Sequence, residues 1–379
     1  MHKRRPLFRH LIALFCAAGS LYPLAASSEA APPVLSRLIV NPADGRYTAI
    51  PDETLLHLSG NFFFDDGDDL LNKALDVKRE GEALEARSRG LILIPGDEQA
   101  VIDALEELDG ATTNLRAEGN MVISSDANEQ VHYVAATTLR GSARFYYDPE
   151  DENRLRLAVV NALFSTGDLE SHLNVAAVVQ SYAGLNYQFD TPRFSNTVFA
   201  IRAKAQVINL LERRIDYDDY EEKRVYDRDA DVSSYFQLNA DLALHHRFRH
   251  VGLGLIVEDI YTRKMRGVSG SAYQQRSLFR VTADYRRDGG ELQLSADLTP
   301  RASFAEVPSR RDINVSGAVN LSRRFALIGA YNYVDHSREK DTGSVGIRYT
   351  LAPMLRFQLA LVAAGPRELG GQLSLQLPL

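Results

Sequence analysis

Apolar and polar residues alternate along most of the chain after residue 131. Over 276–287, for example, charged or polar residues separate Phe279, Val281, Ala283 and Tyr285. Successive side chains of a β-strand point to opposite faces, so a period of two predicts strands with one apolar and one polar face. The same pattern continues to the C-terminal end of the chain, which makes the expected fold class all-β.

Fourteen strands are expected from this alternation, an even number that leaves both chain ends on the same side of a sheet. They are 131–147, 155–164, 169–179, 181–189, 197–214, 232–246, 251–261, 276–287, 291–303, 312–322, 325–335, 342–351, 355–364 and 370–379. The turn expected at Gln180–Ser181 carries no clear turn residue, and the strand count changes if this turn is absent.

The connections between these strands alternate between short and long. Short ones cover 247–250 and 288–290, and longer polar ones cover 215–231 and 262–275. Transmembrane β-barrels have tight periplasmic turns and longer extracellular loops, whereas a soluble sandwich has no reason to keep that order. Strands of about 9–11 residues also suffice to cross a bilayer when tilted. The sequence therefore predicts a fourteen-stranded antiparallel transmembrane β-barrel.

The N-terminal 30 residues have the three parts of a secretory signal peptide. A basic stretch at 2–5 precedes an apolar stretch at 11–26, and small residues follow at Ser28 and Ala30. We expect cleavage after Ala30 and localisation in the outer membrane, with an uncleaved anchor helix as the alternative. The single cysteine, Cys16, lies inside this segment, so the mature chain is expected to contain no disulfide.

A different period appears between the signal peptide and the barrel. The carboxylates of 65–69 precede an apolar stripe at helical spacing, and Pro95-Gly96-Asp97 precedes a second one. We expect a helical hairpin over 65–110, inside an N-terminal segment, 31–130, that is either periplasmic or a plug for the barrel. The expected domains are the signal peptide 1–30, this segment, and the barrel 131–379.

Charge and composition limit the classes of partner that the chain can bind and the ways in which it can cross a membrane. The formal net charge is −7, which argues against nucleic-acid binding because that function needs a basic face. Beyond the first 30 residues no run of 18 apolar residues occurs, so strands must cross the membrane if the chain lies in one. The chain has no tryptophan, and its aromatic belts would consist of tyrosine and phenylalanine.

Several short motifs give the chain a family resemblance. They are Asn41-Pro42-Ala43, the helical insert after Asp65-Asp66, the stretch 169–189, the glycine-containing stretch 251–260, and 292–300 with its Asp-Leu-Thr. With these motifs, the chain resembles the conjugal-transfer TraF-like family of outer-membrane barrels over nearly the whole mature length. The wider group is similar to fatty-acid-transporter barrels with fourteen strands. The resemblance implies an outer-membrane location.

Polar residues on the inward face of the predicted strands are the candidate functional residues. They either line a permeation path or hold a plug, or they are charge pairs that fill the lumen, as polar barrel interiors require. The candidates are Arg280, Asp284, Arg286, Asp297, Asn314 and Asn320.

Two clusters carry the residue types of a metal site. Asp227, Asp229 and Asp231 resemble the opening of a calcium loop, but the glycine and the glutamate that such a loop needs are absent. We therefore expect a solvated acidic loop and no metal site here. Bridging to lipopolysaccharide through divalent cations is the alternative for this acidic run. His245, His246 and His250 lie near an expected turn and would have to converge on one ion. We expect no cofactor.

The expected function is therefore that of a non-enzymatic outer-membrane barrel in contact with lipid and lipopolysaccharide. It either transports small hydrophobic molecules or belongs to an envelope or conjugation assembly. Two alternatives come from other classes: an outer-membrane hydrolase with a triad at one rim, and a secreted soluble β-sandwich that binds partners. No catalytic triad spacing or phosphate-binding glycine loop stands out in the sequence.

Overall fold

The computed structural model describes residues 37–44, 54–89, 94, 96–124, 130–161, 169–190, 193–194, 196–216, 227–287, 289–335, 339–352 and 355–379. The expected signal peptide, 1–30, lies outside the described residues.

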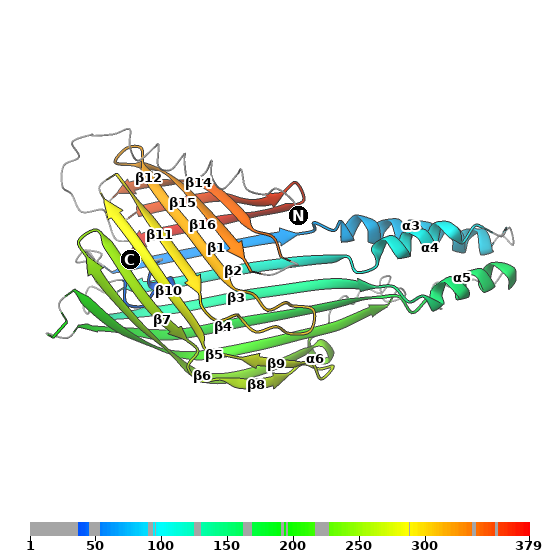
Figure 1. Ribbon diagram of the computed structural model, residues 1–379, viewed down its shortest axis with the longest axis horizontal. Helices are drawn as coiled ribbons and strands as arrows, with labels where there is room; N and C mark the ends of the chain where they lie inside the picture. The colour runs from blue at the N-terminus through cyan, green and yellow to red at the C-terminus, as the bar shows by residue number, and fades with distance from the viewer. Residues whose placement is uncertain are drawn as a thin grey trace.

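Fourteen antiparallel strands close into a barrel, which confirms the predicted fold class (Figure 1). In chain order they are β1 (Leu55–Asp65), β2 (Thr112–Ser124), β3 (Val131–Tyr146), β4 (His172–Asp190), β5 (Thr197–Asp216), β6 (Val232–Phe248), β7 (Val251–Glu258), β10 (Leu278–Arg287), β11 (Gly290–Asp297), β12 (Asp312–Asn320), β13 (Phe325–Val334), β14 (Thr342–Ala352), β15 (Leu355–Gly365) and β16 (Glu368–Pro378). The barrel closes where β16 pairs with β1.

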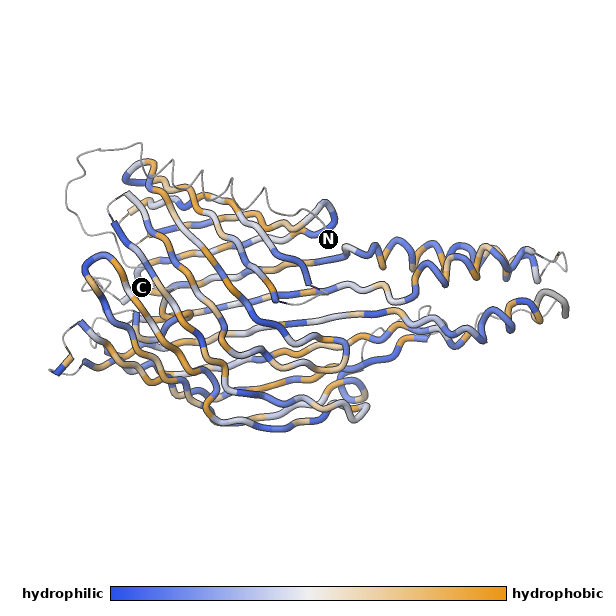
Figure 2. The backbone as a smooth tube through the Cα atoms, viewed as in Figure 1, coloured by the Kyte–Doolittle hydropathy of each residue, from blue (hydrophilic) through white to orange (hydrophobic). Residues whose placement is uncertain are grey.

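Alternation sorts the side chains onto two faces of the wall. Large apolar residues remain exposed on the outer face, among them Phe236, Leu238 and Leu361, whereas the residues between them are buried or polar. Figure 2 shows this alternation along the strands. An apolar outer face around a closed sheet is the surface of a barrel that spans a membrane. Among the described residues, no helix is long and apolar enough to span a membrane.

The two ends of the barrel differ. Leu55, which opens β1, pairs with Pro378 at the end of β16, so both ends of the barrel sheet lie on one side. The turns at that side are short, such as 249–250 between β6 and β7. The opposite side carries three helices that project past the strands: α3 (Leu70–Arg89), α4 (Gln99–Leu108) and α5 (Glu150–Asn161) (Figure 1). We take this as the extracellular side because long loops lie there in such barrels.

The segment 31–130 contributes two barrel strands that the sequence analysis did not include in the barrel. β1 and β2 pair with each other over their whole length. The expected helical hairpin exists as α3 and α4, but it joins these two strands at the loop end, away from the chain termini. Gly60 and Gly119, which pair with each other, interrupt the apolar alternation of both strands and hide their period.

Two other strand predictions were wrong: one predicted strand is not a strand, and two others are a single strand. These two losses offset the two strands added by 31–130, so the total remains fourteen. The stretch 155–164 begins within the helix α5, whose first turn contains Glu150, Asp151 and Glu152. Carboxylates stabilise the positive end of a helix, and this signal outweighs a short alternation. The expected strands 169–179 and 181–189 form one strand, β4, with no turn at Gln180–Ser181.

The loop between β7 and β10 contains a small hairpin where a plain loop was expected. Its strands, β8 (Arg263–Arg266) and β9 (Ala272–Gln275), form a separate two-stranded sheet. Met265 and Tyr273 of this hairpin pack with Phe304 and Val307 from the loop after β11, and with inward side chains of β4 and β5. The two loops therefore cover the extracellular mouth of the barrel on its β4–β5 side.

Candidate functional site

Four of the six inward candidates are joined by ion pairs inside the barrel. Arg280 lies 2.7 Å from Asp297 and 2.8 Å from Glu258, measured between nitrogen and oxygen atoms. Asp284 and Arg286 belong to a second group nearer the chain termini, where Arg286 Nε lies 3.1 Å from an Asp284 oxygen. The two asparagines lie elsewhere: Asn314 is on β12, and Asn320 accepts a 3.4 Å hydrogen bond from Arg348.

A third ion-pair group contains none of the residues that the sequence predicted as candidates. Lys204 on β5 lies 2.6 Å from both Asp241 on β6 and Asp259, and Arg202 lies 3.6 Å from Asp241. All but Asp259 are almost fully buried. The signal was present in the sequence, because Arg202 and Lys204 alternate with apolar residues in the same way as Arg280 and Asp284 do.

Residues 37–44 lie against the inner face of this charged wall. They comprise the short helix α2 (Arg37–Val40) and a turn in which Asn41 Oδ1 accepts a hydrogen bond from the Ala43 amide. The carbonyl oxygen of Pro42 accepts hydrogen bonds from Asn186 at 2.9 Å and Gln188 at 2.5 Å, both on β4. Arg202 donates to the Leu38 carbonyl oxygen.

Apolar contacts hold the same segment. Leu38 packs with Leu55, Val122 and Val134 on β1, β2 and β3. Ala43 packs in a second cluster with apolar side chains of β5, β6 and β7. Both residues are completely buried. The short segment therefore touches the wall from β1 round to β10, and it contains the Asn-Pro-Ala motif on which the family resemblance partly rests.

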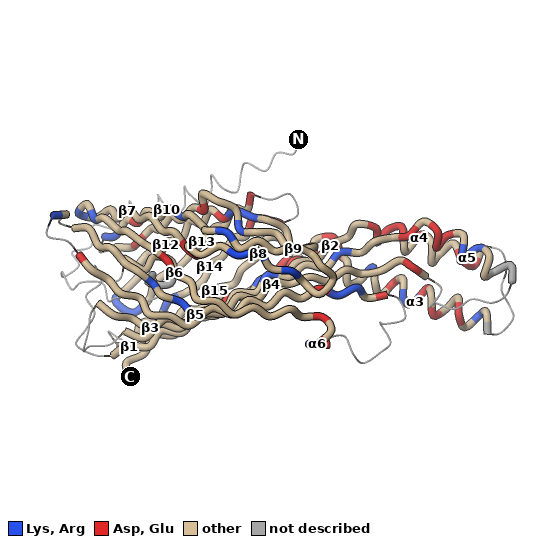
Figure 3. Tube along the Cα trace, turned by 90° about the horizontal axis from the view of Figure 1, so that it is seen from below, with Lys and Arg blue, Asp and Glu red and all other residues tan. Residues whose placement is uncertain are grey.

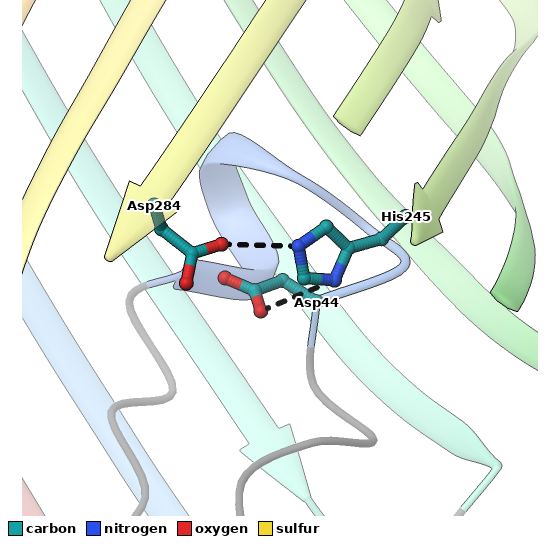
Figure 4. A group of neighbouring side chains, drawn as sticks. All are labelled: Asp44, His245 and Asp284. Carbon is teal, nitrogen blue, oxygen red and sulfur yellow. Dashed lines mark hydrogen bonds and ion pairs between the residues drawn. The ribbon is translucent and has the colours of Figure 1, made fainter. Parts of the chain in front are cut away.

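The end of this segment joins a buried acid–imidazole group (Figure 4). His245 Nε2 lies 3.0 Å from Asp284 Oδ1, and His245 Nδ1 lies 3.6 Å from Asp44 Oδ1. Imidazole and carboxylate groups are common metal ligands, and this is the one such group found among the described residues.

Arginines compensate the carboxylates of this group. Arg286 donates to Asp44 at 2.7 and 2.8 Å, and Arg247 donates to Asp284 at 2.9 Å. Two guanidinium groups balance two carboxylates, so a divalent cation would add uncompensated positive charge in a buried site. The arrangement therefore fits a charged contact between Asp44 and the barrel wall better than a metal centre. We call this contact, formed by Asp44 with Arg286 and His245, the latch.

Glycines make room for this latch. Gly252 and Gly254 point inward on β7, in the glycine-containing stretch noted in the sequence. A Cβ on Gly252 would lie 2.2 Å from Asp284 Oδ1, and one on Gly254 would lie 2.3 Å from Asn41 Nδ2. Because any side chain would fill the space that the segment 37–44 and its partners occupy, the two glycines belong to the docking site.

The predicted metal candidates lie apart from this group. Asp227 caps the short helix α6 (Arg228–Asp231), where it accepts from the Asp229 amide, and Asp231 pairs with Arg213 at 3.0 Å. Of the three histidines, His245 points inward, whereas His246 contacts Thr197 and His250 contacts Tyr285. Neighbours in a strand point to opposite faces, so His245 and His246 do not converge.

Charged side chains also cross the extracellular mouth. Arg310 lies 2.7 Å from Glu339, and Arg116 on β2 lies 3.6 Å from the same carboxylate. In the loop after β11, burial would lower the pKa of Arg301, but the carboxylates of Asp297 and Glu258 raise it above its ordinary value. The Arg301 guanidinium therefore keeps its charge, and the loop bridges the mouth from β4 to β2.

The remaining part of the inner wall carries smaller uncharged side chains. They are half-buried, and they include Ser316, Ala330, Ser344, Gln358, Gln372 and Ser374 on β12 to β16. Beside them, the inward residues Asn61 and Glu118 on β1 and β2 are exposed and hydrogen-bond to each other at 3.2 Å. Exposed side chains on an inner face mean that this side of the lumen contains solvent space.

An apolar pocket lies at the loop end, where the helices meet the barrel. It is formed between α3, α4 and the ends of β3, β4 and β5. Its apolar lining residues include Val77, Leu105, Leu108, Phe145, Leu173 and Ile215. Lys78, Glu82, Glu85, His172 and Asp216 also line it. The pocket can hold a small apolar molecule, because apolar walls with a few polar groups are typical of ligand sites.

One protein family and several solved structures are similar to this chain. The family model described as "F plasmid transfer operon, TraF, protein" matches residues 40–298. No curated protein matches the chain. Among solved structures, the toluene transporter TbuX of Ralstonia pickettii has 7% identity and a TM-score of 0.48, covering 92% of this chain and 94% of its own. The toluene transporter TodX of Pseudomonas putida has 10% identity and a TM-score of 0.45, covering 90% and 92%.

Proposed function

The chain belongs to the F plasmid transfer operon TraF protein family, and from this premise we propose that it is a non-enzymatic outer-membrane barrel that takes up small hydrophobic molecules. The observation that carries the proposal is the apolar pocket beneath α3 and α4 at the loop end. A hydrophobic solute that reaches this pocket leaves water for an apolar surface, which concentrates it beside the barrel mouth.

We propose that residues 37–44 are the plug at the other end of the path. The segment contacts one side of the inner wall through buried apolar residues and through the Asp44 latch. A solute that passes through the lumen must use the side lined by small residues or must displace this segment. Transport therefore couples the pocket at the loop end to a plug at the terminal end.

A variant of α3 tests the pocket. Ala74 lines the pocket, whereas the next residue, Leu75, is 55% exposed and does not line it. Tryptophan at position 74 would fill the space, so Ala74→Trp should remove most of the uptake of radiolabelled toluene by cells that produce the chain. Leu75→Trp is the matched control and should keep normal uptake. Equal uptake by producing cells and by cells without the chain would refute the proposal.

A second candidate function is a part in an envelope or conjugation assembly. The observation in its favour is the helical extension itself, which projects from the barrel and carries many charged residues (Figure 3). On α4, Asp103, Glu106 and Glu107 are exposed, and this helix has no lysine or arginine. Replacing these three residues by glutamine should lower plasmid transfer frequency and leave toluene uptake unchanged if this candidate is correct.

A further inference from the structure

A second, polar cavity lies inside the barrel, beneath the loops that cover the mouth. Its lining comes from β3, β4, the end of β7, the β8–β9 hairpin and the loop after β11. Its volume is about 30 Å³, measured as the space open to the centres of water-sized molecules. The lining residues are Arg140, Gln180, Glu258, Asp259, Tyr273, Gln275, Arg276, Leu278, Arg301 and Ala302. It is separate from the apolar pocket and shares no lining residue with it.

The charges around this cavity do not cancel. Glu258 and Asp259 are its two carboxylates, and each already has a cation that does not line the cavity: Arg280 at 2.8 Å and Lys204 at 2.6 Å. Three arginines line the cavity against them. Of these, Arg301 is paired with Asp297 at 3.6 Å and with Asp312 at 3.8 Å, whereas Arg140 and Arg276 form no ion pair within the described part of the chain. The cavity therefore has a surplus of positive charge.

Arg140 is the group with the least compensation. It donates a hydrogen bond from Nη2 to the Ala302 carbonyl oxygen at 2.9 Å, and its side chain also interacts with Tyr273. Its Nη1 is buried and has no hydrogen-bond partner within the described part of the chain, where Arg140 also forms no ion pair. A buried guanidinium nitrogen without an acceptor is costly, and because Arg140 lines the cavity, a ligand in the cavity could accept from this nitrogen.

Neutral donors stand beside this guanidinium. Gln180 Nε2 donates to the Tyr273 hydroxyl at 3.0 Å, so the hydroxyl keeps its own proton for another acceptor. Tyr273 is 3% exposed, and its ring is fixed edge-on against Phe304. The phenol is therefore held at the cavity wall by the same loops that close the mouth.

We propose that this cavity is a binding site for a small carboxylate, with Arg140 and the Tyr273 hydroxyl as its donors. A carboxylate matches the planar fork of a guanidinium, and its charge offsets the positive charge of Arg140. The inference does not rest on toluene uptake, because it concerns a polar cavity that an apolar solute would avoid.

Calorimetric titration of the full-length barrel in detergent micelles tests the proposal. Sodium acetate is the probe, and acetamide is the uncharged control of the same shape. Acetate should bind and acetamide should not. Arg140→Gln should weaken acetate binding at least about tenfold, because a hydrogen bond to a charged group is lost. Tyr273→Phe keeps the apolar cluster and should weaken binding by a smaller factor, roughly two- to tenfold.

Arg144→Gln is the matched control, since Arg144 lies on the same face of β3 and does not line the cavity. This variant should bind acetate as the unaltered chain does. Equal responses to acetate and acetamide, phosphate binding without acetate binding, or an equal loss in Arg144→Gln would each overturn the proposal. A mobility shift on boiling in gel electrophoresis checks that each variant folds. If Arg140→Gln does not fold, the smaller loss of acetate binding expected for Tyr273→Phe still tests the proposal.

Discussion

The two sides of the barrel interior avoid unpaired buried charges in different ways. From β4 to β10 the inner wall carries large charged residues, and these are paired with each other or with residues 37–44. From β12 to β16 it carries mainly serine, alanine and glutamine, of which some are half-buried and others, such as Ala318 and Ala360, are buried. Both sides avoid unpaired buried charges, one by pairing them and the other by having few.

Strand length follows the same division. β4 and β5 have 19 and 20 residues, whereas β12 and β13 have 9 and 10. The longer strands carry the mouth loops and one wall of the apolar pocket. The comparison teaches that the β4–β10 side is built to hold other segments of the chain in place. Any permanent space in the lumen belongs to the side lined by small residues.

Removal of residues 37–44 is expected to have the largest effect on this arrangement. The deletion leaves β1 and β2 intact, which a deletion of the whole segment 31–130 would not. Single-channel conductance in planar bilayers should rise, because the crowded side of the lumen loses the segment that covers it. A folded barrel with unchanged conductance would show that the mouth loops alone close the lumen, and it would contradict the proposal that residues 37–44 are a plug.

Gly346→Ala should produce the next largest effect, and it acts on the other side. Gly346 points inward on β14, where a Cβ would lie 2.1 Å from the Leu359 carbonyl oxygen of the neighbouring strand. Backbone cannot move aside as a side chain can, so β14 and β15 must separate. Overpacking of this kind costs about 1–3 kcal/mol.

Urea unfolding of the barrel in lipid vesicles measures that cost. Gly119→Ala is the control, because a Cβ on Gly119 meets nothing within 4 Å. Equal unfolding midpoints for Gly346→Ala and Gly119→Ala would contradict the close approach of β14 and β15. A lower midpoint in Gly346→Ala alone would show that the smallest inner side chains set how closely these strands approach each other.

The sequence predicted the barrel because its main signal is local. A period of two needs only neighbouring residues, and it was enough to put Arg280 and Asp297 on the same inner face, where they pair. The prediction failed where the local signal was weak. Glycines blurred the alternation of β1 and β2, and the alternation near Leu155 was too short to distinguish a strand from a helix.

The latch could not have been predicted from the sequence. Asp44 meets Arg286 across 242 positions of the chain, and no periodic pattern reports such a contact. Gly252 and Gly254 were visible as a motif, but their purpose depends on the segment that lies over them. The residues of the inner wall follow from alternation alone, whereas the pairing of a distant segment with that wall is a property of the folded chain.

Gly254→Ala should have a smaller effect than Gly346→Ala, although the two Cβ atoms meet their neighbours at similar distances. The added Cβ of residue 254 would lie 2.3 Å from Asn41 Nδ2 and from Thr282 Oγ1, both of which are side-chain atoms that can move. The barrel should therefore keep its unfolding midpoint, while the segment 37–44 no longer docks against the wall and open events become more frequent.

Thr282→Val is the matched control, since it removes only a 3.4 Å contact with Asn41 and adds no bulk. That contact is long for a hydrogen bond and contributes little, so this variant should open about as rarely as the unaltered chain. Single-channel recordings count the open events of the two variants, and urea unfolding gives their midpoints. If Gly254→Ala lowers the unfolding midpoint and leaves the open events unchanged, Gly254 is needed for the packing of the barrel strands, as Gly346 is, and not for the docking of residues 37–44.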